Sequence, residues 1–476
     1  MITAPAFFTR ITRRLSWRAA LAVACLSLSQ ALGAQEATVP TAADQPLDLY
    51  GAWQQAFAFD PNYRAAVSEF GASQAQKNIS RGGLLPQVSA AYSDRRVSGW
   101  RERPGYLGVI NRTDLSYDST NLNAQLRQPL LNYPRWAEYK RGVAVAKQGG
   151  AQLDIAQQRN SLQVAQNYFN VILAYVDHEE QARRVAFLQL RTLAFEQLQR
   201  KDESTRVELA DTRARLATAY AEQLQATDEL RNAARQLQAQ IGFKPSAIKS
   251  IDPLNPPAPL STPLATLQDQ AREHNREIKA AQQQVNIAKA RLESARSQYF
   301  PSLDLVATAG RGDSEDITTL SQRTNTFTVG LQLQVPIFTG GYTSAISTQA
   351  RYQLQQAEYL YNNALNMIDT QVAKLYHQYQ SGIEQVAAQY QAYKSSQLSL
   401  ESVMISFEAG AASNLDVLEA QDQLSETRYD YYQTQLELVQ TQLELAVMLG
   451  DSLHEPIQKI SQTRFEGADS QTLVLP

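Results

Sequence analysis

The sequence predicts a mainly α-helical protein that also forms a membrane β-barrel, built from a helix–strand–strand–long helical hairpin unit that occurs twice. Three observations support this fold class. Long stretches of the chain are nearly free of glycine and proline, and the first of them covers residues 151–241. Four short segments alternate polar and apolar residues, as half-buried strands do. The spacing of residues in the first half of the chain recurs in the second half.

Length and charge limit the classes of function. A chain of 476 residues can form two or three ordinary domains or one extended molecule. The formal net charge of −3 gives no indication of a nucleic-acid partner. Beyond the N-terminal region, no apolar stretch reaches the roughly 18 residues expected of a membrane-spanning helix.

Residues 1–33 have the pattern of a secretory signal peptide. Four arginines between Arg10 and Arg18 precede an apolar run from Ala19 to Leu28. Small residues at positions 31 and 33 then predict cleavage after Gly33, which is followed by a polar N-terminal lead at 34–46. We therefore expect an exported protein.

The only cysteine, Cys25, lies inside this apolar run. It could be the acylated residue of a lipoprotein signal, but Ala22 stands where such signals usually have a larger aliphatic residue. A plain signal peptide is the preferred interpretation. The mature chain then contains no disulfide and must be held together by packing.

The first repeat is predicted at 47–242. A helix over Leu47–Arg81 should restart at Asp60-Pro61, a cap followed by a first-turn proline, and end at Gly82-Gly83. Strands are predicted at about 86–94 and 119–129, joined by a loop over 94–118. Pro134 should open the next helix. Because an unbroken helix of about 60 residues is ~90 Å long, the run at 151–241 predicts a coiled coil or a folded-back hairpin.

A proline-rich linker at 243–264 separates this repeat from a second one at 265–450, and a C-terminal tail at 451–476 follows. Strands of the second repeat are predicted at about 301–310 and 324–336. The two repeats share an offset of 215 residues, which relates Leu49, Ala56, Asp60, Ala65, Ala66 and Pro86 to Leu264, Ala271, Asn275, Ala280, Ala281 and Pro301.

Strands of about ten residues with one polar and one apolar face fit tilted membrane crossings. Four strands cannot close a barrel, because the smallest single-chain barrels need about eight. Open strand edges in a membrane must therefore be paired by other copies of the chain. The competing interpretation is a soluble α+β protein with one small sheet, which explains neither the duplicated strand pairs nor the long helical runs.

Several short motifs support a resemblance. They are Leu-Pro-Gln at 85–87 with Phe-Pro-Ser-Leu at 300–303, Gln-Pro-Leu-Leu at 128–131 with Val-Pro-Ile-Phe at 335–338, and Gly410 followed by Asp-Val-Leu-Glu-Ala at 416–420. In this order and spacing, from Leu47 to about Gly450, the chain resembles the TolC-like outer-membrane efflux and secretion channels. The resemblance implies a homotrimer in the outer membrane of a Gram-negative cell. Its 12-stranded β-barrel would stand on an α-helical barrel that extends into the periplasm.

The resemblance also implies a periplasmic gate. Asp416 and Glu419 match the acids that ring the periplasmic entrance in that family, and their spacing puts both on one helical face. Such a ring would favour cations. The alternative is simple helix capping, because acids are favoured in a first helical turn. Glu208 and Asp211 are the corresponding pair of the first repeat, at an offset of 208 residues.

The chain departs from the family pattern at the hairpin tips. The first tip lacks the usual glycine, Phe407 stands where a tyrosine is often found, and Ala412 replaces an arginine. Since neither Phe407 nor Ala412 has a side-chain donor, a hydrogen-bonded latch of the family's kind is not expected. The hypothesis is that a cation from Arg200, Lys201 or Arg206 replaces it.

Nothing in the sequence indicates catalysis. The four histidines lack metal-ligand spacing, and no nucleophile is paired with a base. We therefore expect no enzyme activity, no metal and no cofactor. The predicted function is a passive exit duct that works with a periplasmic adaptor and an inner-membrane ABC exporter, in type I protein secretion. The alternatives are a duct for small-molecule efflux driven by a proton-powered pump, and a periplasmic coiled-coil adaptor that forms no channel.

Overall fold

A computed structural model describes residues 46–104, 108, 110–200, 206–251, 259–316, 319–465 and 472–475. The elements described below belong to one compact unit, Gln45–Pro476. The predicted signal peptide, with Cys25, lies outside the described residues. No helix in the described ranges is both long and apolar enough to span a membrane.

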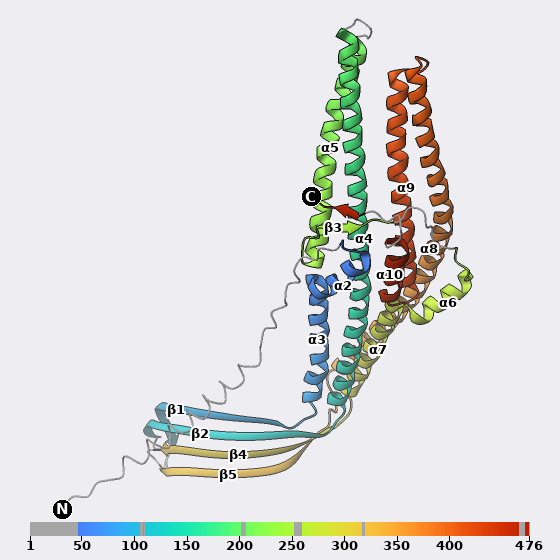
Figure 1. Cartoon of the computed structure of the whole chain (residues 1–476). Coiled ribbons are helices and arrows are strands. Elements are labelled where there is room, and N and C mark those ends of the chain that lie inside the picture. Colours follow the sequence, from blue (N-terminus) through green and yellow to red (C-terminus); the bar gives the residue numbers. More distant parts are fainter. Residues whose placement is uncertain are drawn as a thin grey trace, which may run out of the picture. The chain divides into compact units, whose positions relative to one another are not determined.

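Long helices dominate the chain (Figure 1). The helices of its first half are α2 (Leu49–Phe59), α3 (Pro61–Gly82), α4 (Tyr133–Arg200) and α5 (Arg206–Ile241). Those of its second half are α6 (Leu264–His274), α7 (Arg276–Ser297), α8 (Tyr342–Glu408) and α9 (Asn414–Met448), followed by α10 (His454–Ile460) and the π-helix η1 (Ser461–Phe465).

The two halves have matching helices. Helices α2 and α6 have 11 residues each, and α3 and α7 have 22 each. Helices α4 and α8 have 68 and 67 residues, and α5 and α9 have 36 and 35. The predicted break at Asp60-Pro61 is present: the Asp60 side chain accepts hydrogen bonds from the backbone N–H groups of the first turn of α3. Asn275 caps α7 in the same way and with similar backbone angles.

The long first run is a folded-back hairpin, because α4 ends at Arg200 and α5 begins at Arg206 and packs against it. Helices α8 and α9 form the second hairpin. Helix α8 continues through Gly382, where a β-carbon would lie 3.0 Å from the Leu438 side chain of α9. The glycine therefore permits close approach of the two helices.

One antiparallel sheet contains four long strands, β1 (Gln87–Pro104), β2 (Ile110–Asn132), β4 (Ser302–Asp316) and β5 (Thr319–Gln334), in the order β1-β2-β4-β5. Within one chain, β1 and β5 are the open edges.

The strands are longer than predicted. The stretch at 94–118, expected to be a loop, is mostly strand, because β1 and β2 pair in register from Gln87↔Arg127 to Pro104↔Ile110. In this extension both faces carry polar residues, so the sequence shows no clear alternation. Cross-strand contacts hold it: Arg96 pairs with Asp118, and the Arg112 guanidinium lies 4.5 Å from the centre of the Trp100 ring. The last strand ends at Gln334 rather than 336.

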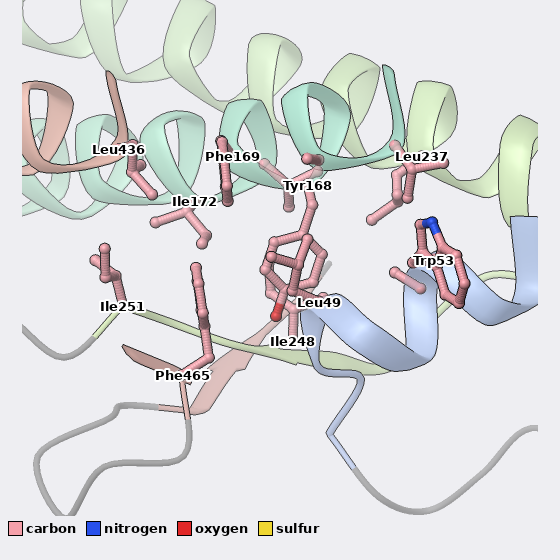
Figure 2. Close-up of a cluster of buried hydrophobic side chains, with 14 of the residues drawn as sticks. Leu49, Trp53, Tyr168, Phe169, Ile172, Leu237, Ile248, Ile251, Leu436 and Phe465 are labelled. Atoms are coloured by element: carbon pink, nitrogen blue, oxygen red, sulfur yellow. The ribbon is translucent and has the colours of Figure 1, made fainter. Parts of the chain in front are cut away.

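The main hydrophobic core lies where α2, α4, α5 and α9 meet (Figure 2). Two parts of it are not indicated by the sequence pattern. The linker contributes β3 (Ala247–Lys249) with the buried Ile248, and the tail contributes Phe465 and β6 (Thr472–Val474), which pairs with β3. The buried Tyr168 hydroxyl lies 2.9 Å and 2.7 Å from the carbonyl oxygens of Leu47 and Lys249. Linker and tail are therefore anchored to the long helices.

Candidate functional site

The tip of the second hairpin is a tight turn between α8 and α9. Gly410 has φ of +73°, in the left-handed region that glycine adopts readily. The N–H groups of Ala411 and Ala412 both donate to the Ser406 carbonyl, at 2.8 Å and 3.2 Å. This satisfies backbone groups at the end of α8 in the manner of a glycine-terminated helix. Ala412 contributes its backbone to the turn and has no polar side chain.

Ser413 and Asp416 form a capping box at the start of α9. The Ser413 hydroxyl accepts from the Asp416 N–H at 3.2 Å, and the Ser413 N–H donates to Asp416 Oδ2 at 2.7 Å. The Ser413 hydroxyl also lies 2.8 Å from that carboxylate oxygen. Donation from the Ser413 backbone, then from its hydroxyl, lowers the pKa of Asp416. Asp416 therefore caps the helix while it keeps its negative charge.

The two predicted gate acids of α9 are both exposed to solvent. Between them, Val417 and Leu418 are buried, and Leu418 packs in a cluster with residues of α4 and α5. The first turns of α9 thus have one face against the other hairpin and an acidic face, carrying Asp416 and Glu419, directed to solvent.

The corresponding acids of the first hairpin are in a different environment. Asp211 forms an ion pair with Arg215, in which Arg215 Nε lies 3.0 Å from Asp211 Oδ2. The charge of Asp211 is therefore partly balanced within α5. Glu208 is half-buried and is not without an interaction partner. Residues 201–205 at this tip, including Lys201, lie outside the described residues.

A contact between the hairpins brings the two acidic pairs into one region. The Asn414 side-chain amide donates to the Thr212 hydroxyl at 3.3 Å, and both residues are buried. Since Thr212 follows Asp211 directly, the start of α9 lies beside the helical turn that carries the acids of α5. The structure thus brings the predicted acids to one end of the molecule's paired hairpins.

Phe407 makes a contact that the sequence pattern does not indicate. The Arg191 guanidinium of α4 lies 4.1 Å from the centre of the Phe407 ring, a cation–π contact between the two hairpins. Burial lowers the pKa of Arg191, and its Nε and Nη2 atoms are buried with no hydrogen-bond partner among the described residues. A side chain without a donor therefore still holds a cation, through its ring face.

Of the hypothesised cations, Lys201 lies outside the described residues, and the other two make no such contact among the residues that are described. Arg200 and Arg206 are exposed, and within the described ranges neither makes a hydrogen bond or ion pair to the second hairpin. The available signal for Arg191 was its heptad-like distance from Arg184, which also faces the second hairpin. Helical periodicity predicts that Arg184 and Arg191 share one face of α4, but it cannot predict which residue of another helix contacts that face.

Ion pairs join the hairpins farther from the tip. Arg184 Nε lies 3.1 Å from an Asp422 carboxylate oxygen of α9. Arg428 Nη1 of α9 lies 2.6 Å from the Glu180 carboxylate of α4, which Arg183 also contacts at 3.0 Å. Glu180 is only 5% exposed, and desolvation raises its pKa although Arg183 opposes the shift.

The described residues contain no group of three or more His, Cys, Asp or Glu side chains that could hold a metal ion. The tip carries the exposed carboxylates of Asp416 and Glu419, which act on charged species through their field.

Comparisons with known proteins agree with this arrangement. A sequence model of the outer membrane efflux protein family matches residues 52–242 and 267–451. The chain is 29% identical over 399 residues to the alkaline protease secretion protein AprF of Pseudomonas aeruginosa. This alignment covers 81% of this chain and 82% of that protein. It is 28% identical over 424 residues to the proteases secretion protein PrtF of Dickeya chrysanthemi, with coverages of 83% and 87%.

Among solved structures, the Campylobacter jejuni CmeC outer membrane channel aligns with a TM-score of 0.73 at 16% identity. The alignment covers 87% of this chain and 89% of that one, so the fold is shared almost throughout.

Proposed function

The chain belongs to the outer membrane efflux protein family, and from this premise we propose that it forms the exit duct of a tripartite exporter. The protein is an outer-membrane channel protein and not an enzyme. We propose further that three copies form one channel, that the helices extend into the periplasm, and that the cargo is a secreted polypeptide.

The observation that carries the channel proposal is a two-faced sheet with two open edges. Register places Leu126, Ala307 and Val329 in one row across β2, β4 and β5, and the polar Gln125, Thr308 and Thr328 in the next row, which faces the other way. Phe327 and Leu331 on this apolar face are 75% and 66% exposed, which is expected of side chains that face lipid.

The opposite face is polar. Arg127 of β2 donates to Asp304 of β4 at 2.9 Å, on the face that a closed barrel would turn to its lumen. Unpaired edges cannot remain in a membrane. Three chains with four strands each would pair all edges in a barrel of 12 strands.

The matching helices support a duplicated unit with two hairpins per chain, and so six hairpin tips in a trimer. Helix α4, with 68 residues, reaches about 100 Å at 1.5 Å per residue. That length suits a helical barrel that crosses much of the periplasm.

At the tip, we assign Asp416 and Glu419 to the periplasmic gate, together with Glu208 and Asp211 of the first hairpin. The exposure of Asp416, Glu419 and Asp211 supports a charged ring, and the capping box is compatible with a charged Asp416. Three copies would concentrate negative charge at the entrance and favour cations. Arg191 and Phe407 would hold the two hairpins of each chain together in the resting state.

Polypeptide secretion is supported by the two relatives named for protease secretion. It implies a periplasmic adaptor and an inner-membrane ABC exporter as partners, because a passive duct needs other proteins to drive transport. Small-molecule efflux is the second candidate function, favoured by the description of the family. The four-stranded sheet disfavours a coiled-coil adaptor, because an adaptor of that kind would have no use for a sheet with one apolar, exposed face.

Two experiments test these proposals. The purified protein in planar lipid bilayers should show ion conductance that favours cations, and absence of conductance would refute the channel. The neighbouring genes separate the cargo classes. An ABC exporter, an adaptor and a secreted substrate encoded beside this gene are the expected finding, whereas a proton-driven pump in their place would favour efflux.

A further inference from the structure

A pocket of about 370 Å³ lies between α4, α7 and α8, near the point where β2 ends and α4 begins. Its lining includes Tyr133, Lys289, Leu292, Glu293, Arg296, Phe300 and Leu354. Arg296 is the last residue but one of α7 and stands six residues before Ser302, the first residue of β4. The pocket is therefore at the level where a membrane surface would meet the helices.

The rim of the pocket is cationic. Lys289 and Arg296 are seven residues apart on α7, hence on the same helical face, and both are exposed. Neither makes an ion pair or a side-chain hydrogen bond within the described part of the chain. Two cations on one rim thus have no anion among the residues of this protein that the structure describes.

The only carboxylate in the lining is already occupied. Glu293 accepts hydrogen bonds from Lys140 Nζ at 2.7 Å and from the Tyr133 hydroxyl at 2.8 Å. These two donors, Lys140 first, lower the pKa of Glu293. Its charge is balanced by Lys140 and does not neutralise the rim.

The floor of the pocket is apolar. Leu292 and Leu354 line it, and the Phe300 ring packs 5.0 Å from the Tyr133 ring while remaining 53% exposed. Tyr133 follows Leu131 by two residues, and Leu131 pairs with Leu303 on the apolar face of the sheet. Tyr133 is the first residue of α4 and directly follows β2, so the pocket lies where the helices meet the sheet.

We propose that this pocket binds an anionic phospholipid of the periplasmic leaflet. The phosphate pairs with Lys289 and Arg296, and the glycerol and upper acyl chain pack on Phe300 and the leucine floor. Basic side chains just outside a membrane core attract anionic headgroups, and an aromatic ring with an exposed edge suits the interface. The inference rests on the proposed position of the sheet in the outer membrane.

The test is native mass spectrometry of the purified channel titrated with phosphatidylglycerol. We expect about one tightly held lipid per chain and weaker retention of zwitterionic phosphatidylcholine. Loss of both cations, in Lys289→Gln with Arg296→Gln, should weaken retention roughly 30-fold. The double variant Lys289→Arg with Arg296→Lys exchanges the two side chains and keeps both positive charges. It should preserve lipid retention, which would show that the fold tolerates substitution at these positions.

Lys279→Gln is the matched control, because Lys279 is an exposed cation of the same helix, ten residues before Lys289 and farther from the sheet. Retention of phosphatidylglycerol by the double glutamine variant at the wild-type level would overturn the proposal. So would equal competition by glycerol phosphate, which has the headgroup chemistry without the acyl chains. Bilayer conductance on the same preparation separates the two proposals: a conducting channel with unchanged lipid retention refutes the lipid site alone, and no conductance refutes the channel.

Discussion

Replacing Phe407 with leucine should open the resting channel. Leucine keeps an apolar side chain at the seam but removes the ring face on which the Arg191 guanidinium lies, at 4.1 Å from the ring centre. A cation–π contact contributes about 0.5–1 kcal/mol at exposed sites and about 2 kcal/mol when desolvated. Because Arg191 is half-buried, about 1 kcal/mol per chain is a reasonable value. If three seams must open together, their sum of about 3 kcal/mol raises the open-to-closed ratio roughly 150-fold.

The assay is single-channel recording in planar bilayers, with open probability at low voltage as the measured quantity. Phe407→Tyr is the matched control, since it keeps the aromatic face and should behave as the wild type. Phe187→Leu provides a second control, because the Phe187 ring lies farther from the same guanidinium, at 5.7 Å. Equal open probability in Phe407→Leu and Phe407→Tyr would refute a latch that acts through the ring.

Three further predictions concern charge, stability and packing. Asp416→Asn keeps a cap acceptor but removes the charge, so bilayer reversal potentials should show reduced cation selectivity. Ser413→Ala should keep the selectivity and lower the denaturation temperature. The reverse result would mean that Asp416 acts only as a helix cap. Arg428→Met leaves the buried Glu180 with one cation fewer and should cost about 3 kcal/mol in chemical denaturation. Burial raises the pKa of Glu180 above its unfolded value of about 4.3, so its contribution to stability should be largest below that pH and decline as pH rises through the folded pKa. Arg428→Met should extend this decline to higher pH. An unchanged pH profile of stability would contradict this expectation. Gly382→Val should destabilise the second hairpin by about 1–3 kcal/mol, measured in the same denaturation experiment, because its side chain has no room against α9; wild-type stability would contradict close packing there.

Sequence periodicity and caps predicted the helices well, because those signals are local. The break at Asp60 needs only a capping side chain followed by proline, and Asn275 repeats it with another short polar residue. The turn at Gly410 needs only one residue with positive φ. Each of these features is determined by interactions within a few residues of the chain.

Contacts between distant segments were not predictable in the same way. The outer halves of the strands have polar residues on both faces, so only pairing with the opposite strand identifies them. Ile248 and Phe465 are buried because linker and tail meet on α4, which no local pattern in either segment indicates. Arg191 belongs to the same class, since its ring partner comes from a helix more than 200 residues away in sequence.

Among these contacts between the hairpins, the one that costs most to break lies away from the tip. Farthest from it, Glu180 and Arg428 form a largely buried ion pair, and removing one partner of such a pair costs about 3–5 kcal/mol. Arg191 and Phe407 come next, with about 1 kcal/mol, and the neutral hydrogen bond from Asn414 to Thr212 contributes about 0.5–1.5 kcal/mol. Separation of the hairpins therefore costs less near Asp416 and Glu419 than at the pair of Glu180 with Arg428. A force applied by a partner at the tip would move the acids first, and the buried pair would limit how far the opening extends toward the membrane.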